Sequence, residues 1–190
     1  MFSKELLILQ KEINNLLNSK SLVVISIDGK SASGKSTLAE ALNEIYDCNI
    51  FKMDDFFLTP ALRTEERLKE VGGNVDYLRF NKEIIQGILS QKNFNYNKYN
   101  CMNNSFNKSE EIRTKELNII EGCYSMHPTL INYYDFKIFL DISYEDQIKR
   151  ILKRNGKEKL QRFVDEWIPK ENKYFNEMKI KDKADLIISV

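Results

Sequence analysis

Hydrophobic and polar positions along the chain follow two patterns, one typical of helices and one typical of buried strands. Between residues 4 and 19, leucine and isoleucine recur near helical spacing, which predicts a helix with one apolar face. Residues 22–27, LVVISI, form a short β-rich run that ends at Asp28 and Gly29. Such runs are typical of strands that are covered on both faces, as in parallel sheets.

The same two patterns predict the remaining elements. Further strands are expected at 49–53, 117–120, 137–142 and 184–190. Helices are expected at 36–46, 81–90, 144–154 and 158–177, with helical potential at 65–70 before a break at two glycines. Strands that alternate with helices predict an α/β fold, in which helices flank both faces of a mostly parallel central sheet. Such a fold has three layers, with the sheet between two layers of helices.

The polar middle of the chain is harder to interpret. Residues 93–108 are rich in asparagine, so disorder is one interpretation, but the tract is short and contains enough aromatic residues to fold against a neighbour. No repeat period appears, and no linker divides the chain. We therefore expect one domain over residues 1–190, with an inserted polar region.

A phosphate-binding motif lies between the first strand and the second helix. Residues 29–36, GKSASGKS, match G-x-x-x-x-G-K-[ST], with the required strand before and helix after. The glycines let the backbone curl so that its N–H groups point at phosphate oxygens, and the helix N-terminus favours negative charge. Lys35 can then reach the terminal phosphates, and Ser36 can bind magnesium. The residues expected to bind ATP are Gly29, Lys30, Ser31, Ala32, Ser33, Gly34, Lys35, Ser36 and Thr37.

Acidic residues follow two of the predicted strands, at the sheet edge where α/β proteins bind ligands. Asp54 and Asp55 follow the strand 49–53, and Glu121 follows the strand 117–120. For each acid, a solvated strand-end residue is the structural alternative. Because successive side chains of an extended segment point to opposite sides, we expect Asp54 and Asp55 to have different roles.

Arg150 and Arg154 are four residues apart, on one face of a predicted helix. Such a pair can clamp ATP phosphates and stabilise charge during phosphoryl transfer. Lys149 and Lys153 share the segment, so a solvated basic face is the alternative. The sequence leaves both interpretations open.

Composition and charge narrow the classes of function. The 190 residues include 29 basic and 28 acidic side chains, a net charge of +1 that gives no case for nucleic acid or an acidic membrane. Three widely spaced cysteines fit free thiols in a reducing compartment. The N-terminal segment is too short and too charged for a signal peptide or a membrane span. We expect a cytoplasmic protein without nucleic-acid or membrane partners, and leave homo-oligomer formation open.

Taken together, the motifs resemble the uridine kinase and phosphoribulokinase group of P-loop kinases, which implies the three-layer P-loop NTPase fold. The matching stretches occur in the family's order from about residue 22 onward: IDGKSASGKST, KMDDFFL, GGNVDYLRF, YNKYNC, IIEGCYSMHP, YDFKIFLDI, RILKRNG and ADLII. GGNVDYLRF, EGCYSMHP and WIPKENKYF are most similar to bacterial proteins described as uridine kinases.

The resemblance implies ATP-dependent phosphorylation of a small molecule's hydroxyl group, with the 5′-hydroxyl of a pyrimidine nucleoside as the leading acceptor and Mg²⁺ as cofactor. By position, Asp54 is similar to the family's catalytic base, and Glu121 to the acid that helps Ser36 hold magnesium. Arg150 and Arg154 are similar to lid arginines that contact ATP. With Lys35, these two arginines and Asp54 form the predicted catalytic set.

The resemblance also implies a substrate-binding region at about 57–110 and a lid at about 144–165, after an N-terminal helix at 1–20. Asn74 or Asp76 falls near the family's ribose-binding acid, and Tyr99 near an aromatic residue that packs on the nucleobase. For Tyr99 and the sole histidine, His127, a structural role is the alternative. The expected substrate-binding residues are Asp55, Arg63, Asn74, Asp76, Arg79, Tyr99, Tyr124 and His127.

The chain departs from the family pattern at three places. A histidine-proline pair is absent around Val75, an arginine-aspartate pair is Arg154-Asn155, and Cys101 stands where an aromatic residue is common. These differences keep the kinase class but leave the base and the acceptor open. The alternatives are a kinase for another hydroxylated metabolite, such as a vitamin, sugar or pantothenate-like acid, and a non-catalytic nucleotide-binding regulatory module.

Overall fold

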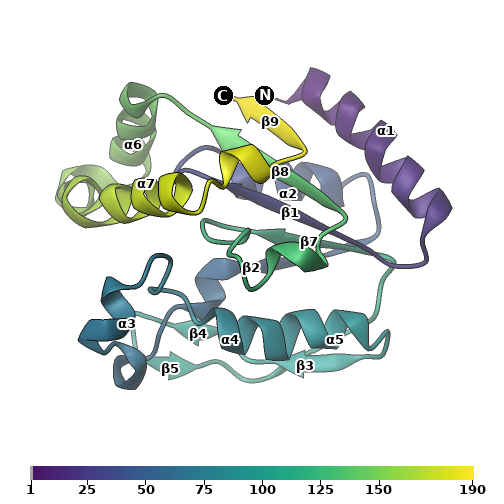
Figure 1. Cartoon of the computed structure of the whole chain (residues 1–190), viewed down its shortest axis with the longest axis horizontal. Coiled ribbons are helices and arrows are strands. Elements are labelled where there is room, and N and C mark those ends of the chain that lie inside the picture. Colours follow the sequence, from purple (N-terminus) through teal and green to yellow (C-terminus); the bar gives the residue numbers. More distant parts are fainter. Residues whose placement is uncertain (1) are drawn as a thin grey trace.

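The computed structural model describes residues 2–190 of the chain. Its centre is a sheet of five parallel strands in the order β2-β7-β1-β8-β9 (Figure 1). All five predicted strands form, with ends shifted by a few residues, and the predicted α/β class is confirmed. The strands are β1 (Val23–Gly29), β2 (Cys48–Lys52), β7 (Leu117–Glu121), β8 (Phe136–Asp141) and β9 (Leu186–Ser189).

Each predicted helical segment contains a helix of the structure, but the segment predicted at 81–90 is divided into a π-helical turn and a helix. The helices are α1 (Ser3–Ser19), α2 (Lys35–Asn43), α3 (Glu65–Lys69), α4 (Tyr77–Phe80), α5 (Gln86–Leu89), α6 (Tyr144–Arg162) and α7 (Ile168–Glu177). Single turns of 3-10 helix occupy Met53–Phe56, Pro60–Leu62, Ile131–Tyr133 and Lys181–Lys183, and π-helical turns occupy Asn81–Ile85 and Phe163–Trp167.

The central strand β1 shows why helices cover both faces of the sheet. Val23, Ile25 and Ile27 lie on one face, in a core with apolar residues of α1 and α2. Val24 lies on the other face, in a core with residues of α4, α5 and α7. Because side chains alternate along a strand, an apolar run places hydrophobic groups on both faces and each face requires a cover.

The helix of the inserted region begins earlier than the sequence pattern predicts. The expected start was residue 81, whereas α4 begins at Tyr77 and continues through the π-helical turn Asn81–Ile85 into α5. Asp76 caps this start, because its Oδ1 accepts a hydrogen bond from the backbone N–H of Arg79 at 3.0 Å. A side-chain cap of this kind satisfies an N–H group that lacks a partner inside the helix.

The asparagine-rich tract folds into two short antiparallel strand pairs. These pairs are β3 (Phe94–Tyr96) with β6 (Glu110–Ile112), and β4 (Tyr99–Asn100) with β5 (Ser105–Phe106). The rings of Phe94 and Tyr96 both lie 6.0 Å from the ring of Phe51, measured between centroids. The aromatic residues of the tract therefore fold it against the core, which is the second of the two interpretations.

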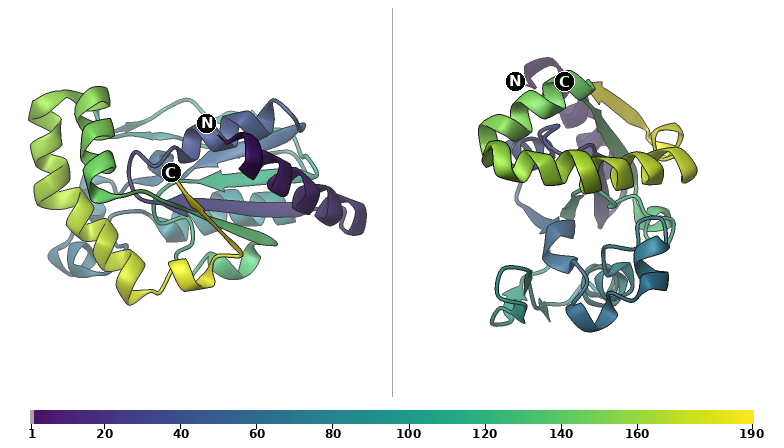
Figure 2. Two further views of the ribbon diagram at one scale, coloured as in Figure 1. Left: turned by 90° about the horizontal axis from the view of Figure 1, so that it is seen from above. Right: turned by 90° about the vertical axis from the view of Figure 1, so that its left-hand side faces the viewer.

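Helix α6 consists of two segments that meet at Gly156. This residue has φ 78° and ψ 173°, outside the helical region. The break coincides with the gap predicted between residues 154 and 158. Figure 2 shows α6 and α7 on one side and the region of α3, β4 and β5 on the other.

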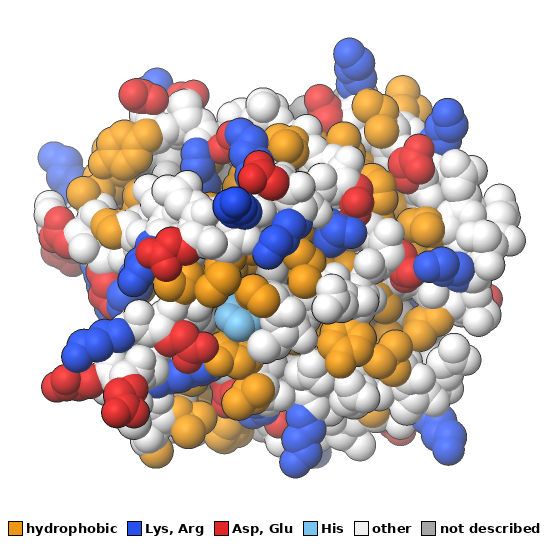
Figure 3. Space-filling view, viewed as in Figure 1, with side chains coloured by type: hydrophobic (Ala, Val, Ile, Leu, Met, Phe, Trp, Pro, Cys, Tyr) orange, Lys and Arg blue, Asp and Glu red, His pale blue; other side chains and the backbone are white. Residues whose placement is uncertain are grey.

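The surface carries charges of both signs. Figure 3 shows Lys and Arg side chains interspersed with Asp and Glu side chains over one face of the molecule. Across residues 2–190, no helix combines the length and the hydropathy that crossing a bilayer requires.

Candidate active site

The loop between β1 and α2 has the backbone that a phosphate site requires. Gly29 has φ 142° and Gly34 has φ 100°, and a β-carbon at Gly29 would collide with the carbonyl oxygen of Leu140. Lys35 Nζ donates hydrogen bonds to the carbonyl oxygens of Gly29, at 2.8 Å, and Lys30, at 2.9 Å. The first turn of α2 has no side-chain cap, so its N–H groups are free to receive an anion.

Ser36 and Glu121 lie side by side beneath this loop. The Ser36 hydroxyl donates a hydrogen bond to Glu121 Oε1 at 2.9 Å. Burial raises the pKa of Glu121, while the bond from Ser36 and the charge of Lys35 act in the opposite direction. Hydroxyl and carboxylate oxygens are ligands that Mg²⁺ accepts together with substrate phosphates, so the pair fits a magnesium ion held beside a nucleotide.

Asp54 and Asp55 lie in the 3-10 turn Met53–Phe56. Their backbone is therefore helical and not extended as expected, but the two side chains still have different surroundings. Asp55 accepts a hydrogen bond from Tyr96 at 3.4 Å, on the side of the β-strand pairs. Asp54 is exposed, and its negative charge contributes to the raised pKa of Glu121. Among residues 2–190, the Asp54 carboxylate takes part in no hydrogen bond or ion pair.

Only one of the two predicted lid arginines reaches the loop. Arg150 Nη1 donates to the carbonyl oxygen of Ala32 at 3.5 Å. Arg154 is exposed, and its Nε donates to Asn155 Oδ1 at 2.8 Å. Arg150 therefore contacts the phosphate loop, whereas Arg154 contacts Asn155, next to the break at Gly156.

Two predicted substrate residues are occupied in holding the inserted region together. Arg63 Nε donates to the carbonyl oxygen of Leu58 at 3.0 Å. Arg79 donates to the carbonyl oxygens of Asp55 and Asn97, both at 2.9 Å, and its guanidinium lies 3.9 Å from the centroid of the Phe56 ring. Asp76 is engaged as the cap of α4, as described above.

The remaining predicted substrate residues include two buried tyrosines. The Tyr99 hydroxyl donates to Asn104 Oδ1 at 3.0 Å, and the Tyr124 ring lies 4.8 Å from the ring of Tyr174. Asn74 borders a cavity of about 230 Å³ between the inserted region and α7. The cavity is lined by Leu68, Lys69, Glu70, Val71, Gly72, Asn74, Lys170 and Lys173.

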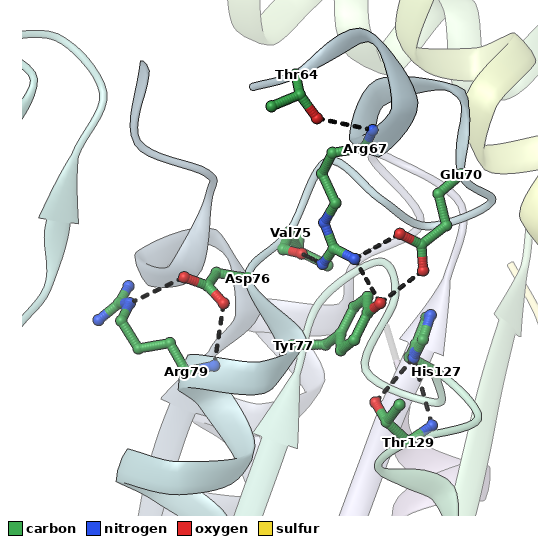
Figure 4. Close-up of polar contacts among 9 residues, drawn as sticks. All are labelled: Thr64, Arg67, Glu70, Val75, Asp76, Tyr77, Arg79, His127 and Thr129. Atoms are coloured by element: carbon green, nitrogen blue, oxygen red, sulfur yellow. Dashed lines mark hydrogen bonds and ion pairs between the residues drawn. The ribbon is translucent and has the colours of Figure 1, made fainter. Parts of the chain in front are cut away.

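His127 belongs to a cluster of polar and aromatic side chains with Glu70, Tyr77 and Thr129 (Figure 4). Its ring stacks on Tyr77 with 4.1 Å between centroids, and its Nδ1 lies 2.9 Å from the Thr129 hydroxyl. The Tyr77 hydroxyl in turn donates to Glu70 Oε1 at 2.5 Å. Burial lowers the pKa of His127 to about 4, so the ring is neutral at pH 7. These contacts support the structural alternative for His127.

Comparison with known families decides the classification. The description "PRK: Phosphoribulokinase / Uridine kinase family" matches residues 24–190. The chain belongs to this family. Its members are P-loop kinases, so the protein is a phosphotransferase of that type, for which the family implies ATP, normally with Mg²⁺, and a small-molecule substrate.

Solved structures agree with this family at the level of the fold. The chain is similar to a possible uridine kinase from Bacillus stearothermophilus, with a TM-score of 0.67 and 18% identity over 95% of this chain and 98% of that one. It is also similar to a candidate fructose transport system kinase from Silicibacter sp. TM1040, with a TM-score of 0.64 and 20% identity over 88% and 90% of the two chains. At these identities the likeness shows the fold alone. No curated protein matched the chain.

In this member of the phosphoribulokinase and uridine kinase family, three buried polar residues beside the loop were absent from the sequence-based site. The first is Asp28, which accepts hydrogen bonds from Gly29 N at 2.7 Å, Met126 N at 2.8 Å and the Tyr174 hydroxyl at 2.8 Å. Its place directly before the motif was the signal available in the sequence. The other two, Gln147 and Glu171, lie on α6 and α7, where only the helical pattern was visible.

Proposed function

We propose that this P-loop kinase transfers the γ-phosphoryl group of ATP to the 5′-hydroxyl of a pyrimidine nucleoside. The single observation that carries the proposal is the Asp54 carboxylate. It is exposed, lacks an internal partner among residues 2–190, and lies near enough to the Ser36–Glu121 pair for its charge to raise the pKa of Glu121. A carboxylate in that state is available to a substrate hydroxyl.

The other residues of the site have roles that follow from their positions. Lys35, held within the loop, neutralises phosphate charge, and the N–H groups of the loop and of α2 bind phosphate oxygens. Arg150 adds a second positive charge from the lid side. When bound, MgATP supplies the transferable phosphoryl group. Asp54 orients the acceptor hydroxyl and accepts its proton.

The choice of a nucleoside rests on the inserted region. GGNVDYLRF and EGCYSMHP are similar to segments of bacterial proteins described as uridine kinases, and these two segments meet in the Tyr77–His127 stack. Asn74, near the family's ribose-binding position, borders the cavity beside α7. The acceptor is therefore proposed to lie between the inserted region and α7.

A panel of acceptors tests the proposal directly. Purified protein with Mg²⁺ and ATP is incubated with nucleosides, sugars, vitamins and pantothenate-like acids, and acceptor-dependent ADP release is measured. We expect uridine or cytidine to exceed every other acceptor. Turnover on a non-nucleoside with a flat response to nucleosides would contradict the choice of acceptor. ATP binding without turnover on any acceptor would instead favour a regulatory module.

Asp54→Asn tests the role of the base. Removal of a positioned general base typically costs roughly 100- to 10,000-fold in turnover, and we expect a loss in that range. Affinity for MgADP should change little, because Asp54 lies outside the phosphate loop. Asp55→Asn, which changes the neighbouring carboxylate that faces Tyr96, is the matched control and should retain more activity. Equal turnover in wild type and Asp54→Asn would exclude Asp54 as the base.

A further inference from the structure

Helix α6 of the predicted lid and helix α7, which follows it, hold the outer part of the phosphate loop, which we define as residues 30–32. The Glu171 carboxylate of α7 accepts hydrogen bonds from the Ser31 backbone N–H, at 2.9 Å, and from the Ser31 hydroxyl. Gln147 of α6 donates its side-chain amide to the Ser31 carbonyl oxygen at 3.1 Å. Every polar group of Ser31 therefore has a partner on a helix more than 100 residues away in sequence.

The residues on either side of Ser31 are held in a similar way. Lys30 Nζ donates to the Ile142 carbonyl oxygen at 2.9 Å and pairs with Asp141 Oδ1 at 2.8 Å. Arg150 reaches the Ala32 carbonyl oxygen. The entrance to α6 and the helix itself thus contact both neighbours of Ser31.

The outer loop needs these contacts, because its own residues do not favour the conformation. Ala32 has φ 62°, a left-handed backbone that is costly for a residue with a β-carbon. No glycine occurs between positions 29 and 34. A loop of this composition keeps a strained shape only when surrounding groups determine it.

Loss of the hydrogen bonds to Ser31 would leave the Glu171 carboxylate buried without a partner. Its side chain is buried, with 4% of the residue exposed. A carboxylate in such a place is stable only when it is hydrogen-bonded, and both of its oxygens are used on Ser31. Gln147 is also buried, with 2% exposed. The hydrogen bonds from both side chains to Ser31 are therefore buried contacts and not surface contacts.

We propose that Glu171, supported by Gln147, is a positioning residue that sets the phosphate loop in its nucleotide-binding shape. The inference deepens the proposed function and rests on its nucleotide-binding part, but not on the identity of the acceptor. It assigns to α7 a direct effect on nucleotide affinity, although Glu171 contacts the loop and not the phosphate. Helices α6 and α7 and the phosphate loop then act as one unit.

The test compares nucleotide affinity with stability in a set of variants. MgADP binding is measured by calorimetric titration without any acceptor, and thermal unfolding is measured without nucleotide. Loss of a hydrogen bond to a charged group corresponds to roughly tenfold or more in an equilibrium, so Glu171→Ala should weaken MgADP binding by about that factor. Glu171→Gln, which can still accept from the Ser31 N–H and donate to its hydroxyl, should recover most of the affinity.

Phe175→Leu separates positioning from general damage to α7. Phe175 lies on the same helix but packs against Phe139 in the core, 5.1 Å between ring centroids. The Phe175→Leu variant should have a lower unfolding temperature, because a conservative change in the core acts on stability. Its affinity for MgADP should stay within about twofold of the wild-type value. Equal loss of affinity in Phe175→Leu and Glu171→Ala would overturn the inference, as would wild-type affinity in Glu171→Ala. Wild-type protein that binds no nucleotide would overturn the proposed function as well.

Discussion

Asp28 is a single residue whose ionisation is linked to folding near neutral pH. Its carboxylate accepts three hydrogen bonds, yet the side chain is fully buried. Burial raises its pKa from 3.8 to about 6, against the opposing effects of these hydrogen bonds and of Lys35. The folded protein therefore binds a proton at Asp28 more tightly than the unfolded chain does.

Because the pKa of Asp28 is raised in the folded protein, the free energy of unfolding should depend on pH. The contribution of Asp28 is full below about pH 4 and is lost as the pH rises through 6, so wild type should lose stability relative to Asp28→Asn over that range. The shift corresponds to roughly 3 kcal/mol in total. Urea unfolding of both proteins between pH 3.5 and 7.5 measures this difference in the free energy of unfolding. Asp182→Asn, at an exposed position, serves as the control. A pH-independent difference for Asp28→Asn would contradict the shifted ionisation.

At the residue scale, the sequence identifies groups that a local motif places. Lys35 and Ser36 are fixed by the loop pattern, and Glu121 by the end of its strand; the structure brings all three together. Glu171 and Gln147 could not be found in this way, because their partner Ser31 lies far away in sequence and no local pattern distinguishes them from other helical residues. Arg79 is the opposite case: the sequence predicts that it binds substrate, whereas its guanidinium donates hydrogen bonds to backbone carbonyl oxygens within the fold.

At the scale of elements, the break in α6 depends on one backbone conformation. Gly156 combines φ 78° with ψ 173°, a region that is essentially restricted to glycine. A β-carbon at this position would meet no atom within 4 Å, so the conformation alone requires glycine. The break turns the chain between Arg150, which touches the phosphate loop, and the second half of the lid.

Gly156→Ala should therefore destabilise the protein through backbone strain. We expect a loss of roughly 1–3 kcal/mol in the free energy of unfolding, measured by urea denaturation. Lys157→Ala, an adjacent exposed substitution without strain, should stay within about 0.5 kcal/mol of wild type. Wild-type stability in Gly156→Ala would show that the break tolerates a different backbone conformation.

Elements with a strong pattern were predictable, and those shaped by tertiary contacts were not. The five strands and the break near Gly156 follow from apolar runs and a helix-breaking residue. The turn Met53–Phe56 did not, because nothing in its sequence distinguishes a 3-10 turn from the end of a strand. The asparagine-rich tract left two outcomes open, and packing of Phe94 and Tyr96 on Phe51 decided between them.

At the scale of the whole molecule, nucleotide binding should stabilise the fold. The phosphate loop joins β1 to α2 and contacts α6 and α7, so a bound nucleotide acts on elements from most of the chain. At a free concentration about 100 times its dissociation constant, a ligand adds about 2.7 kcal/mol. For a protein of this size, that corresponds to a rise in Tm of roughly 5–11 °C.

The rise in Tm is measured by thermal unfolding with and without MgADP. Lys35→Ala should abolish most of the rise at the same nucleotide concentration, because it removes the ammonium group that lies inside the loop. Asp54→Asn is the control and should keep the rise. The same shift in Lys35→Ala and wild type would place nucleotide binding elsewhere on the protein.

The order of strands in the sheet has a consequence for synthesis. Strand β1 ends at residue 29, but its neighbours β7 and β8 begin at residues 117 and 136. The apolar centre of the sheet therefore stays unpaired on the ribosome until β7 and β8 have been made, a period in which nascent chains depend on chaperones. The phosphate motif is translated well before Glu171, so a nascent chain carries the motif long before it carries the helix that holds it.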